Sequence, residues 1–532
     1  MSKATEMAKV SAKGGFHLLW GLVASTVISS VGTIILAGLL SSGDLGLYAI
    51  ALAAPNLIAN FRDWGINTAI VKYSAQYRSE NNIAKIRSVF VAGFAFEIIL
   101  GLVLSLLSLV LSGFLATTFY NRPAITQLIQ IASFFILTGA LVSTATAAFT
   151  GMEKMHLNSI MLIIQSAFKT GLIIGLVLLG LGTLGAIDGF ILAVLTAGIV
   201  GVLLVFTMYR EFPNPNHIKL ELMQTIKTMI KYGLPLSIGS ILAGFLAYFY
   251  SFVMAFFVTD NSLIGSYSVS TNFVVLITFF ATPVTTMLFP AFSKLDFAKE
   301  GELLKNVFQF SVKYSALIVV PVTFLVMALA HPGIFILFGS KYPEAPLFLV
   351  LQSVAYLFTA IGSLSAGNLI NGQGYTKYNL MLTILTVAVG FPLSFVMVFQ
   401  FGIIGLIVAT STVGIPSLLF ALRFIKKNFG VSVDWRSSIK ILFSSGLSGL
   451  LTYFSLSLFP SSSLIQLFTQ LIFGVIIFAI SFVLISIITR TINRNDLTNI
   501  RQIAKGFGPL SKLLNIFVNL IEILMKIFRV LT

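Results

Sequence analysis

The sequence contains no cysteine, and its other reactive residue types are sparse. With no Cys among the 532 residues, disulfides, thiolate catalysis and cysteine metal sites are excluded. The four histidines are dispersed without the spacing that metal ligands require, and no Walker-type phosphate loop occurs. We therefore expect no metal, no cofactor and no ATP hydrolysis by this chain, and we predict that it is not an enzyme.

Charged residues are also scarce, and this scarcity sets the class of the protein. Only 9% of the residues are charged, whereas 57% are hydrophobic, and the mean hydropathy is +1.00. Ordinary soluble domains have about 25% charged residues, so the sequence predicts an all-α polytopic membrane protein. The net charge of +16 does not indicate nucleic-acid binding, because the basic residues are scattered over short gaps between apolar runs.

Apolar runs of about 20 residues are long enough to cross a bilayer, and the sequence contains fourteen such runs. The first, from about residue 15 to 40, is too long for the core of a signal peptide, so we interpret it as a span. Of the 33 Lys and Arg residues, 29 lie at the termini and in alternate gaps, and only two lie in the opposite gaps. Because cytoplasmic segments are enriched in Lys and Arg, we expect both termini to be cytoplasmic and the protein to lie in the cell membrane.

The chain also shows a weak internal repeat with a shift of about 218 residues. It places Leu45–Ile50 on Ile264–Val269 after a one-residue slip. Six spans per period leave the halves in the same orientation, so we predict two six-helix lobes related by a pseudo-twofold axis along the membrane normal. The predicted parts are a first lobe, a cytoplasmic linker, a second lobe, two additional helices and an amphipathic cytoplasmic tail: 1–208, 209–231, 232–422, 440–489 and 490–532.

The segment "LLSSGDLGLYAIALAAPNLIANFRDWGINTAIVKYSAQY" carries a resemblance to a known family. Through Gly46-Leu47-Tyr48 and Asp63-Trp64-Gly65 it resembles the lipid-linked oligosaccharide flippases of the polysaccharide-biosynthesis family. That family belongs to the multidrug/oligosaccharidyl-lipid/polysaccharide exporter superfamily. The twelve-plus-two arrangement of spans is similar to that of the lipid II flippases. The resemblance implies that a glycan headgroup passes between two lobes, while the two extra helices offer the lipid tail a hydrophobic groove. Peripheral packing or a dimer contact is the alternative for these helices.

Polar residues within the second span, at about 45–70, form the first candidate site. Asn56, Asn60, Asp63 and Asn67 recur at intervals of four, three and four residues, which predicts that they share one face of a continuous helix. Arg62 lies next to this face. A charged side chain at membrane depth usually faces a bundle interior or a wet cavity, so we expect this stretch to line a transport path.

Two further ionisable residues, Glu97 and Lys169, are predicted to lie near the middle of the bilayer. Arg62 and Lys169, with Asn60 and Asn56, are the candidate substrate-binding residues, because Arg and Lys bind phosphate. Asp63 and Glu97 are candidates for coupling to a proton or a monovalent cation, or for ion pairing. The alternative is that all four charged residues form a structural ion-pair network, since buried charges are usually paired.

Three function classes follow from these observations. The favoured one is a flippase that moves a polyprenyl- or dolichyl-(pyro)phosphate-linked oligosaccharide from the cytoplasmic to the outer leaflet by alternating access. The alternatives are a cation-coupled multidrug exporter of the same architecture and an integral-membrane glycan polymerase or glycosyltransferase. Membrane lipids and glycan-assembly enzymes are the further expected partners.

Overall fold

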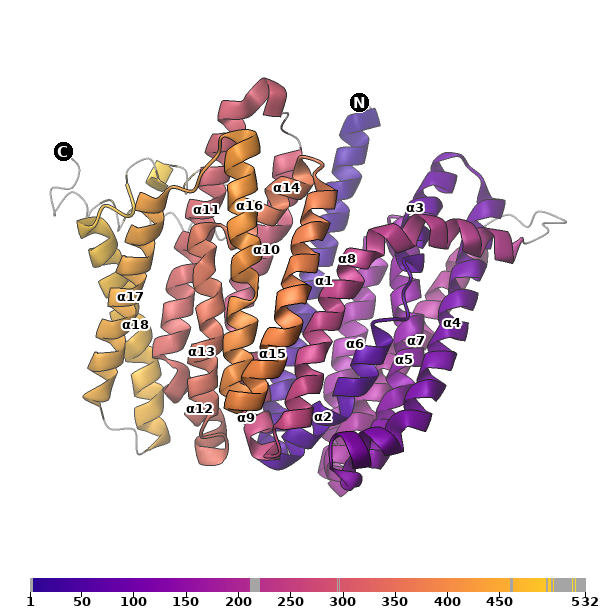
Figure 1. Cartoon of the computed structure of the whole chain (residues 1–532), viewed down its shortest axis with the longest axis horizontal. Coiled ribbons are helices and arrows are strands. Elements are labelled where there is room, and N and C mark those ends of the chain that lie inside the picture. The colour runs from indigo at the N-terminus through magenta and orange to yellow at the C-terminus, as the bar shows by residue number, and fades with distance from the viewer. Residues whose placement is uncertain are drawn as a thin grey trace. The chain divides into compact units, whose positions relative to one another are not determined.

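The computed structural model of the chain describes residues 3–210, 221–293, 295, 297–459, 463–493, 496–498, 501, 519 and 522. This described part is built from eighteen α-helices joined by short turns and contains no strand (Figure 1). The helices are α1 (Lys3–Leu39), α2 (Ser42–Ala59), α3 (Ile66–Ser79), α4 (Ile83–Phe114), α5 (Thr126–Gly151), α6 (Met155–Leu176), α7 (Gly182–Arg210), α8 (Leu222–Phe257), α9 (Asn261–Phe273), α10 (Val275–Ser293), α11 (Phe297–Ala328), α12 (Ala330–Phe338), α13 (Ala345–Leu357), α14 (Ser363–Gly372), α15 (Thr376–Thr412), α16 (Gly414–Phe429), α17 (Trp435–Ser457) and α18 (Leu464–Ile488).

Eleven helical stretches in the described residues are long and apolar enough to cross a membrane. A twelfth crossing arises if Ala345–Ile361 and Ser363–Gly372, which are bent by 51°, form one span. The prediction of an all-α polytopic membrane protein is therefore confirmed. The predicted amphipathic tail lies almost wholly outside the described residues, as does 211–220 of the predicted linker.

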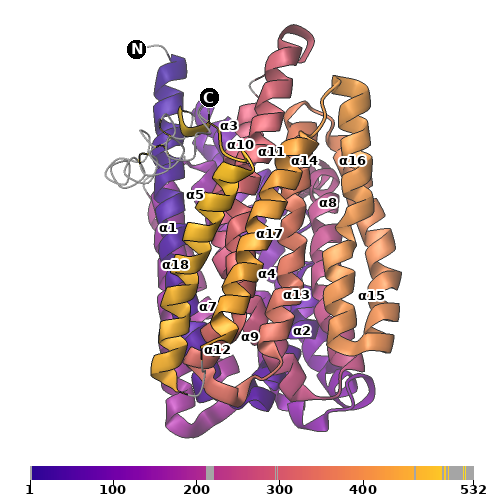
Figure 2. The ribbon, with the colours of Figure 1, turned by 90° about the vertical axis from the view of Figure 1, so that its left-hand side faces the viewer.

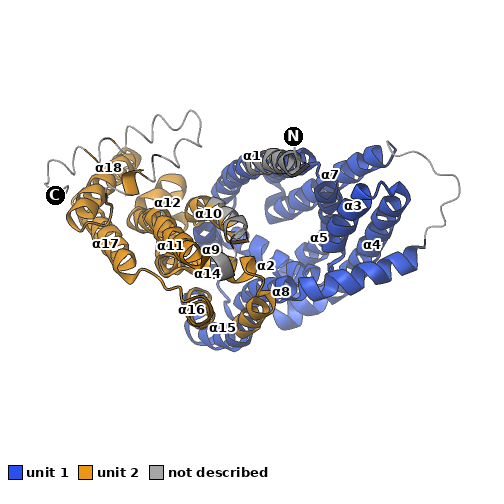
Figure 3. Cartoon of the chain, turned by 90° about the horizontal axis from the view of Figure 1, so that it is seen from above, with its two compact units in different colours: residues 1–272, 387–406 blue, residues 273–386, 407–532 orange. Residues whose placement is uncertain are grey.

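The chain forms two compact units (Figure 3). The first contains Met1–Asn272 and Val387–Leu406, and we call it unit 1. Within unit 1, α5 packs against α4 and α7, α6 packs against α1 and α7, and α8 contacts α2, α3 and α4. These contacts bury a core in which small residues such as Ala92, Ala148 and Ala197 let the helices approach closely.

The second compact unit contains Phe273–Thr386 and Ile407–Thr532, and we call it unit 2. Its α11 contacts α10, α13 and α17, and its last two helices, α17 and α18, run side by side (Figure 2). After α18 the chain is held by Asp496, whose carboxylate lies 2.7 Å from the Lys313 ammonium of α11. This ion pair fastens the end of the last membrane helix to the helix against which α17 packs.

Helix starts in the described chain carry the side chains that local chemistry requires. Four backbone N–H groups at each helix start lack an intrahelical acceptor, and Ser, Asp or Asn side chains supply one. Ser41 accepts from the Asp44 N–H at 3.0 Å at the start of α2, and Asn82 accepts from the Lys85 N–H at 3.2 Å at the start of α4. Ser463 and Gln466 form a reciprocal capping box at α18.

The predicted continuous helix over the second span is wrong. Helix α2 ends at Ala59 and α3 begins at Ile66, so Asn56, Asn60, Asp63 and Asn67 do not share one helical face. Gly65 has a φ of 82°, a left-handed conformation that glycine adopts without strain. Asp63 then accepts a hydrogen bond from the Asn67 N–H at 3.2 Å, which stabilises the first turn of α3. The polar residues therefore mark a break in the span.

Candidate functional site

The break between α2 and α3 places Arg62 inside unit 1. Its Nε lies 2.7 Å from Oε2 of Glu97 on α4. Its Nη1 donates to the Ile136 carbonyl of α5 at 3.0 Å, and its Nη2 donates to the Ser143 hydroxyl at 2.8 Å. The exposed fraction is 9% for Arg62 and 0% for Glu97. The guanidinium therefore links the break to α4 and α5 from a site that little solvent reaches.

Glu97 has a partner on each carboxylate oxygen. Asn67 of α3 donates to Oε1 at 3.0 Å, while Arg62 occupies Oε2. Breaking a buried pair by removing one partner leaves an uncompensated charge, which is strongly destabilising. The structure thus brings Arg62, Asp63 and Glu97 together around the break, and the contacts of Arg62 favour the ion-pair interpretation. The role of these residues in binding cargo stays a prediction.

Asn60 lies at the same break but contacts a different helix. Its Nδ2 donates to the Ile241 carbonyl of α8 at 2.8 Å, and a Cβ on Gly244 would overlap its side-chain oxygen. Between two and three turns earlier along α8, Gly65 and Gly233 approach so closely that a Cβ on either would overlap the backbone of the other. Asn60 and these glycines therefore hold the break against α8, while Asn56 remains half-buried on α2.

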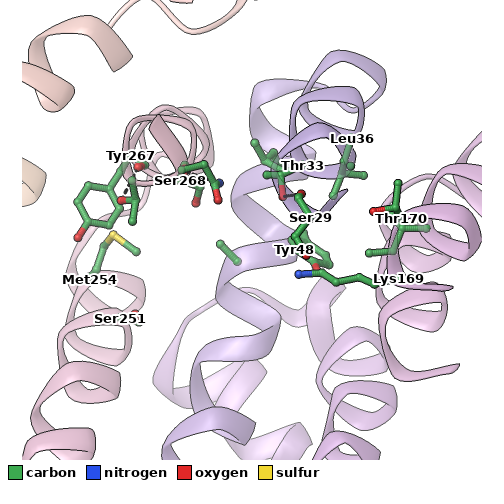
Figure 4. A pocket seen from close by; sticks show the side chains of 16 residues that line it. Ser29, Thr33, Leu36, Tyr48, Lys169, Thr170, Ser251, Met254, Tyr267 and Ser268 are labelled. Atoms are coloured by element: carbon green, nitrogen blue, oxygen red, sulfur yellow. Dashed lines mark hydrogen bonds between the residues drawn. The ribbon is translucent and has the colours of Figure 1, made fainter. Parts of the chain in front are cut away.

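Lys169 is separate from this cluster and lines a pocket of about 280 Å³ within unit 1. The pocket lies among α1, α2, α6, α8 and α9, and its polar lining consists of Ser29, Thr33, Tyr48, Lys169, Thr170, Ser251, Tyr267, Ser268, Thr271 and Asn272. In Figure 4 the ammonium of Lys169 lies beside Tyr48, and Met254 and Tyr267 lie on the opposite wall. One cation and many hydroxyl groups thus face a single cavity, which no described carboxylate lines.

The Lys169 side chain rests against an aromatic ring but has no anionic partner in the described chain. Its Nζ lies 5.4 Å from the centroid of the Phe190 ring, and no ion pair to a described carboxylate involves it. A cation over a ring face is held electrostatically while its charge remains available. The alternative of a single network of four charged residues is therefore not what the described residues form, since Arg62 pairs with Glu97 while Lys169 faces the pocket.

The sequence analysis missed the half of this pocket that α8 and α9 supply. Tyr267 and Thr271, and likewise Ser268 and Asn272, are four residues apart and lie on neighbouring positions of α9. These pairs of polar residues inside an apolar run were the available signal. Lys169, by contrast, was predicted from the sequence as a candidate substrate-binding residue, and it lines the pocket.

Beyond the pocket, α2 and α9 cross at their first turns. Ser262 donates to the Ser42 hydroxyl at 2.8 Å, a Cβ on Gly46 would overlap the Asn261 carbonyl, and a Cβ on Gly265 would overlap the Ser42 carbonyl. The two glycines are the positions that the internal repeat aligns. Close approach of helices through glycine is typical of membrane proteins, and here it closes this end of unit 1.

Arg122 reinforces the same end from the turn between α4 and α5. Its Nε donates to the Asn261 side-chain oxygen at 2.9 Å, its Nη1 to the Ala255 carbonyl at 2.7 Å, and its Nη2 to the Val258 carbonyl. The last carbonyls of a helix lack intrahelical donors and carry partial negative charge. Arg122 therefore caps the end of α8 and links it to the start of α9.

Comparison with known proteins places this site in a family. The profile of the family described as "Polysaccharide biosynthesis protein" matches residues 35–347, more than half of the chain. The chain belongs to this family. The match covers the α2–α3 break, the Arg122 contacts and the part of the Lys169 pocket that lies after residue 34.

Relatives and solved structures agree with this assignment. An uncharacterized membrane protein of Methanocaldococcus jannaschii is 24% identical over 426 residues, 77% of this chain and 83% of that protein. The probable low-salt glycan biosynthesis flippase Agl15 of Haloferax volcanii is 24% identical over 259 residues, 47% of this chain and 52% of that protein.

Among solved structures, the lipid II flippase MurJ in an inward closed conformation has a TM-score of 0.69 at 16% identity, covering 88% of this chain and 98% of that one. An inward-facing multidrug resistance transporter of the MATE family has a TM-score of 0.58 at 14% identity, covering 78% and 98%. The family member described here is thus a multi-pass membrane protein with a fold that flippases and multidrug transporters share.

Proposed function

We propose that this chain is a flippase for an oligosaccharide linked to a polyprenyl or dolichyl phosphate or pyrophosphate, and that it carries this cargo from the cytoplasmic to the outer leaflet. The observation that carries the proposal is the pocket in which Lys169 and many hydroxyl groups face one cavity. Family membership and the similarity to a probable glycan biosynthesis flippase agree with it.

The side chains of the pocket suit both polar parts of such a cargo, its phosphate group and its glycan. An ammonium group attracts a phosphate as a point charge, and hydroxyl and amide side chains exchange hydrogen bonds with the hydroxyl groups of a glycan. Met254 and the tyrosine rings add apolar surface, on which sugar rings pack. Moving the cargo changes none of its covalent bonds, so the proposed activity is transport and needs no catalytic residue.

The proposed architecture has fourteen crossings. Met155–Arg210 is 56 residues long and Thr376–Phe429 is 54, whereas one crossing needs about 20. Gly180 and Gly182 in the first stretch and Gly402 in the second have positive φ, which supports a reversal at each place. The eleven stretches, the one bent pair and one extra crossing from each long stretch together amount to fourteen.

On this basis we keep the predicted lobes at 1–208 and 232–422, the linker at 209–231, and the separate helices at 440–489 before the cytoplasmic tail. The lobes share one orientation, both termini are cytoplasmic and the protein lies in the cell membrane. The sequence repeat aligns Gly46 with Gly265. At the α2–α9 crossing, Gly46 of α2 lies against the backbone of Asn261 at the start of α9, and Gly265 of α9 lies against the backbone of Ser42 of α2. This reciprocal contact supports a pseudo-twofold relation between the lobes.

The additional helices supply a path for the lipid tail in this proposal. Within unit 2, an apolar pocket of about 470 Å³ lies between α17 and the helices α11, α12 and α13. Gly446 and Gly449 face Phe324 there, so the surface of α17 is hollow at this point. A photoreactive polyprenyl chain should label α17, and labelling confined to α1–α16 would contradict this path.

A cation-coupled multidrug exporter is the second candidate, because a MATE-family transporter has the same fold. A cationic drug would be held best by carboxylates, whereas the described lining of the Lys169 pocket contains a lysine and no carboxylate. In the flippase proposal a proton or a monovalent cation couples to transport at Asp63 or Glu97. Glycan-assembly enzymes are the proposed protein partners.

The flippase proposal is tested by removing the Lys169 charge. Losing a charge-assisted contact to phosphate should lower the rate of glycolipid translocation about tenfold or more in Lys169→Ala, measured with a fluorescent lipid-linked oligosaccharide in reconstituted vesicles. Lys169→Arg should retain much of the rate. Lys427→Ala, which removes an exposed lysine of α16, should leave it unchanged. If Lys169→Ala transports glycolipid normally, or if vesicles export a cationic dye but not the glycolipid, the proposal is wrong.

A further inference from the structure

We propose that unit 1 contains a second binding site, which takes the phosphate-bearing headgroup of a membrane lipid. It is a pocket of about 300 Å³ between the last turns of α3 and the first turns of α4 and α8. None of its lining residues lines the Lys169 pocket. The inference does not depend on which cargo the protein transports.

Three kinds of side chain line this pocket. Lys85 contributes an ammonium group. Hydroxyl groups come from Ser88 of α4 and from Thr225 and Thr228 of α8, and two aromatic rings come from Tyr73 and Tyr77 of α3. The rings of Tyr73 and Tyr77 stack with centroids 5.9 Å apart. A phosphate group accepts hydrogen bonds strongly from ammonium and hydroxyl donors, while the tyrosine rings cover the apolar part of a headgroup.

Cations at this pocket are positioned by rings and not neutralised by acids. The Lys85 Nζ lies 5.2 Å from the Tyr77 ring centroid. Outside the lining, the Lys72 Nζ lies 3.7 Å from the ring centroid of Tyr232. Tyr232 in turn packs edge-to-face on Tyr73. No ion pair within the described chain involves Lys72 or Lys85. The positive charge of Lys85 is therefore available to an anion in the pocket.

One carboxylate also borders the pocket, that of Glu221. It is exposed and directly precedes α8, which begins at Leu222. In that position it interacts favourably with the N-terminal end of the helix dipole, and water screens it from a ligand deeper in the pocket. Lys85, the cation in the lining, therefore decides the sign of charge that the pocket accepts.

The depth of the pocket selects a lipid over a soluble anion. Lys85 and Ser88 lie in the first two turns of α4, and Thr225 and Thr228 lie in the first two turns of α8. At 1.5 Å per residue, these side chains lie within about 9 Å of the helix starts. The polar headgroup layer of a bilayer occupies about the same depth on each side, and tyrosines are enriched there.

The test uses the full-length protein and short-chain phosphatidic acid, with binding measured by native mass spectrometry. A lysine near a membrane surface contributes about fivefold to anionic lipid binding, so Lys85→Ala should weaken phosphatidic acid binding by about that factor. Lys85→Arg should restore it. Phosphatidylcholine, whose headgroup carries no net charge, should bind more weakly and should be insensitive to Lys85→Ala.

Three results would overturn the inference. Unchanged phosphatidic acid binding in Lys85→Ala would exclude the site, and an equal loss in Lys427→Ala would show only a diffuse basic surface. Displacement of the lipid by equimolar inorganic phosphate would show a site for the free ion. Lys169→Ala should bind phosphatidic acid at this pocket normally even where glycolipid transport is lost, so the failure of one proposal is distinguishable from the failure of the other.

Discussion

Arg62 shows at the scale of a single residue how a charge is held inside a membrane protein. Its guanidinium contacts Glu97, the Ile136 carbonyl and Ser143. The substitution Arg62→Met replaces the guanidinium with an apolar side chain, which leaves the Glu97 carboxylate buried without its cation. We expect a loss of about 3 kcal/mol or more in the free energy of unfolding, measured in detergent.

The double variant separates this structural role from a role in binding cargo. Replacing both partners by apolar residues removes the uncompensated charge, so Arg62→Met with Glu97→Leu should be more stable than Arg62→Met alone. If Arg62→Met instead unfolds like the wild type but loses glycolipid transport, Arg62 contacts the cargo and the ion pair is not its main role.

Asp434 offers a test by pH at the start of α17. The Ser437 hydroxyl donates to its Oδ2 at 2.6 Å, and the Ser437 N–H donates to Oδ1 at 3.3 Å. Burial by itself raises the pKa of Asp434, but these hydrogen bonds outweigh burial and hold the pKa below its ordinary value. The stability that this carboxylate contributes is therefore present above the unfolded pKa of about 3.9 and is lost as the pH falls through the lower folded value.

We accordingly expect Asp434→Ala to cost about 1 kcal/mol of unfolding free energy at pH 7. The difference from the wild type should shrink as the pH approaches 3, and thermal unfolding in detergent at several pH values measures it. Asn is an equally good cap without a titrating group, so Asp434→Asn should be close to the wild type at pH 7. A difference for Asp434→Ala that grows on acidification would contradict the assigned sign.

At the scale of helices, the crossing of α2 and α9 is the contact most sensitive to a single methyl group. A Cβ on Gly46 would overlap the Asn261 carbonyl, so Gly46→Ala should push the two helices apart at this end. The chain has no cysteine, and Ser42 and Ser262 are joined by a 2.8 Å hydrogen bond. Ser42→Cys with Ser262→Cys should therefore form a disulfide readily, and addition of Gly46→Ala should reduce its yield several-fold.

A matched glycine provides the control for this measurement. A Cβ on Gly113 of α4 would meet nothing within 4 Å, so Gly113→Ala should leave the disulfide yield unchanged. The proposed alternating-access cycle requires this end to open, so the crosslinked protein should stop transporting and recover on reduction. Full transport by the crosslinked protein would mean that α2 and α9 stay together throughout the cycle.

At the scale of the whole molecule, the proposed fourteen-span topology predicts which turns face outward. Single cysteines at Thr259 and Gln400 should react with an impermeant thiol reagent added outside sealed cells, because each follows an odd number of crossings from the proposed cytoplasmic N-terminus. Cysteines at Ser79 and Asn428 should react only after the membrane is opened. All four side chains are exposed. Labelling of Ser79→Cys from outside would reverse the assigned orientation, and protection of Gln400→Cys would remove the reversal at Gly402.

How far the sequence reached differs between the helices and the site. The two additional helices, predicted at 440–489, correspond to α17 (Trp435–Ser457) and α18 (Leu464–Ile488). Hydropathy predicted them well because it depends only on residues that are near one another in the chain. The same reasoning treated 45–70 as one helix. It missed the break because apolar residues flank the break on both sides. The left-handed conformation of Gly65, and the hydrogen bond that Asp63 accepts from the Asn67 N–H, become evident only in three dimensions.

The sequence by itself determined that this protein is helical, membrane-embedded and a member of its family, and it identified Arg62, Glu97 and Lys169 as charges that need an explanation. Only the tertiary structure decided their partners. Glu97 lies 35 positions from Arg62 in the chain, and the wall of Tyr267 and Ser268 opposite Lys169 comes from a helix nearly a hundred residues away. Spacing along a chain specifies which side chains share a face of one helix, whereas the packing of separate helices specifies which faces meet.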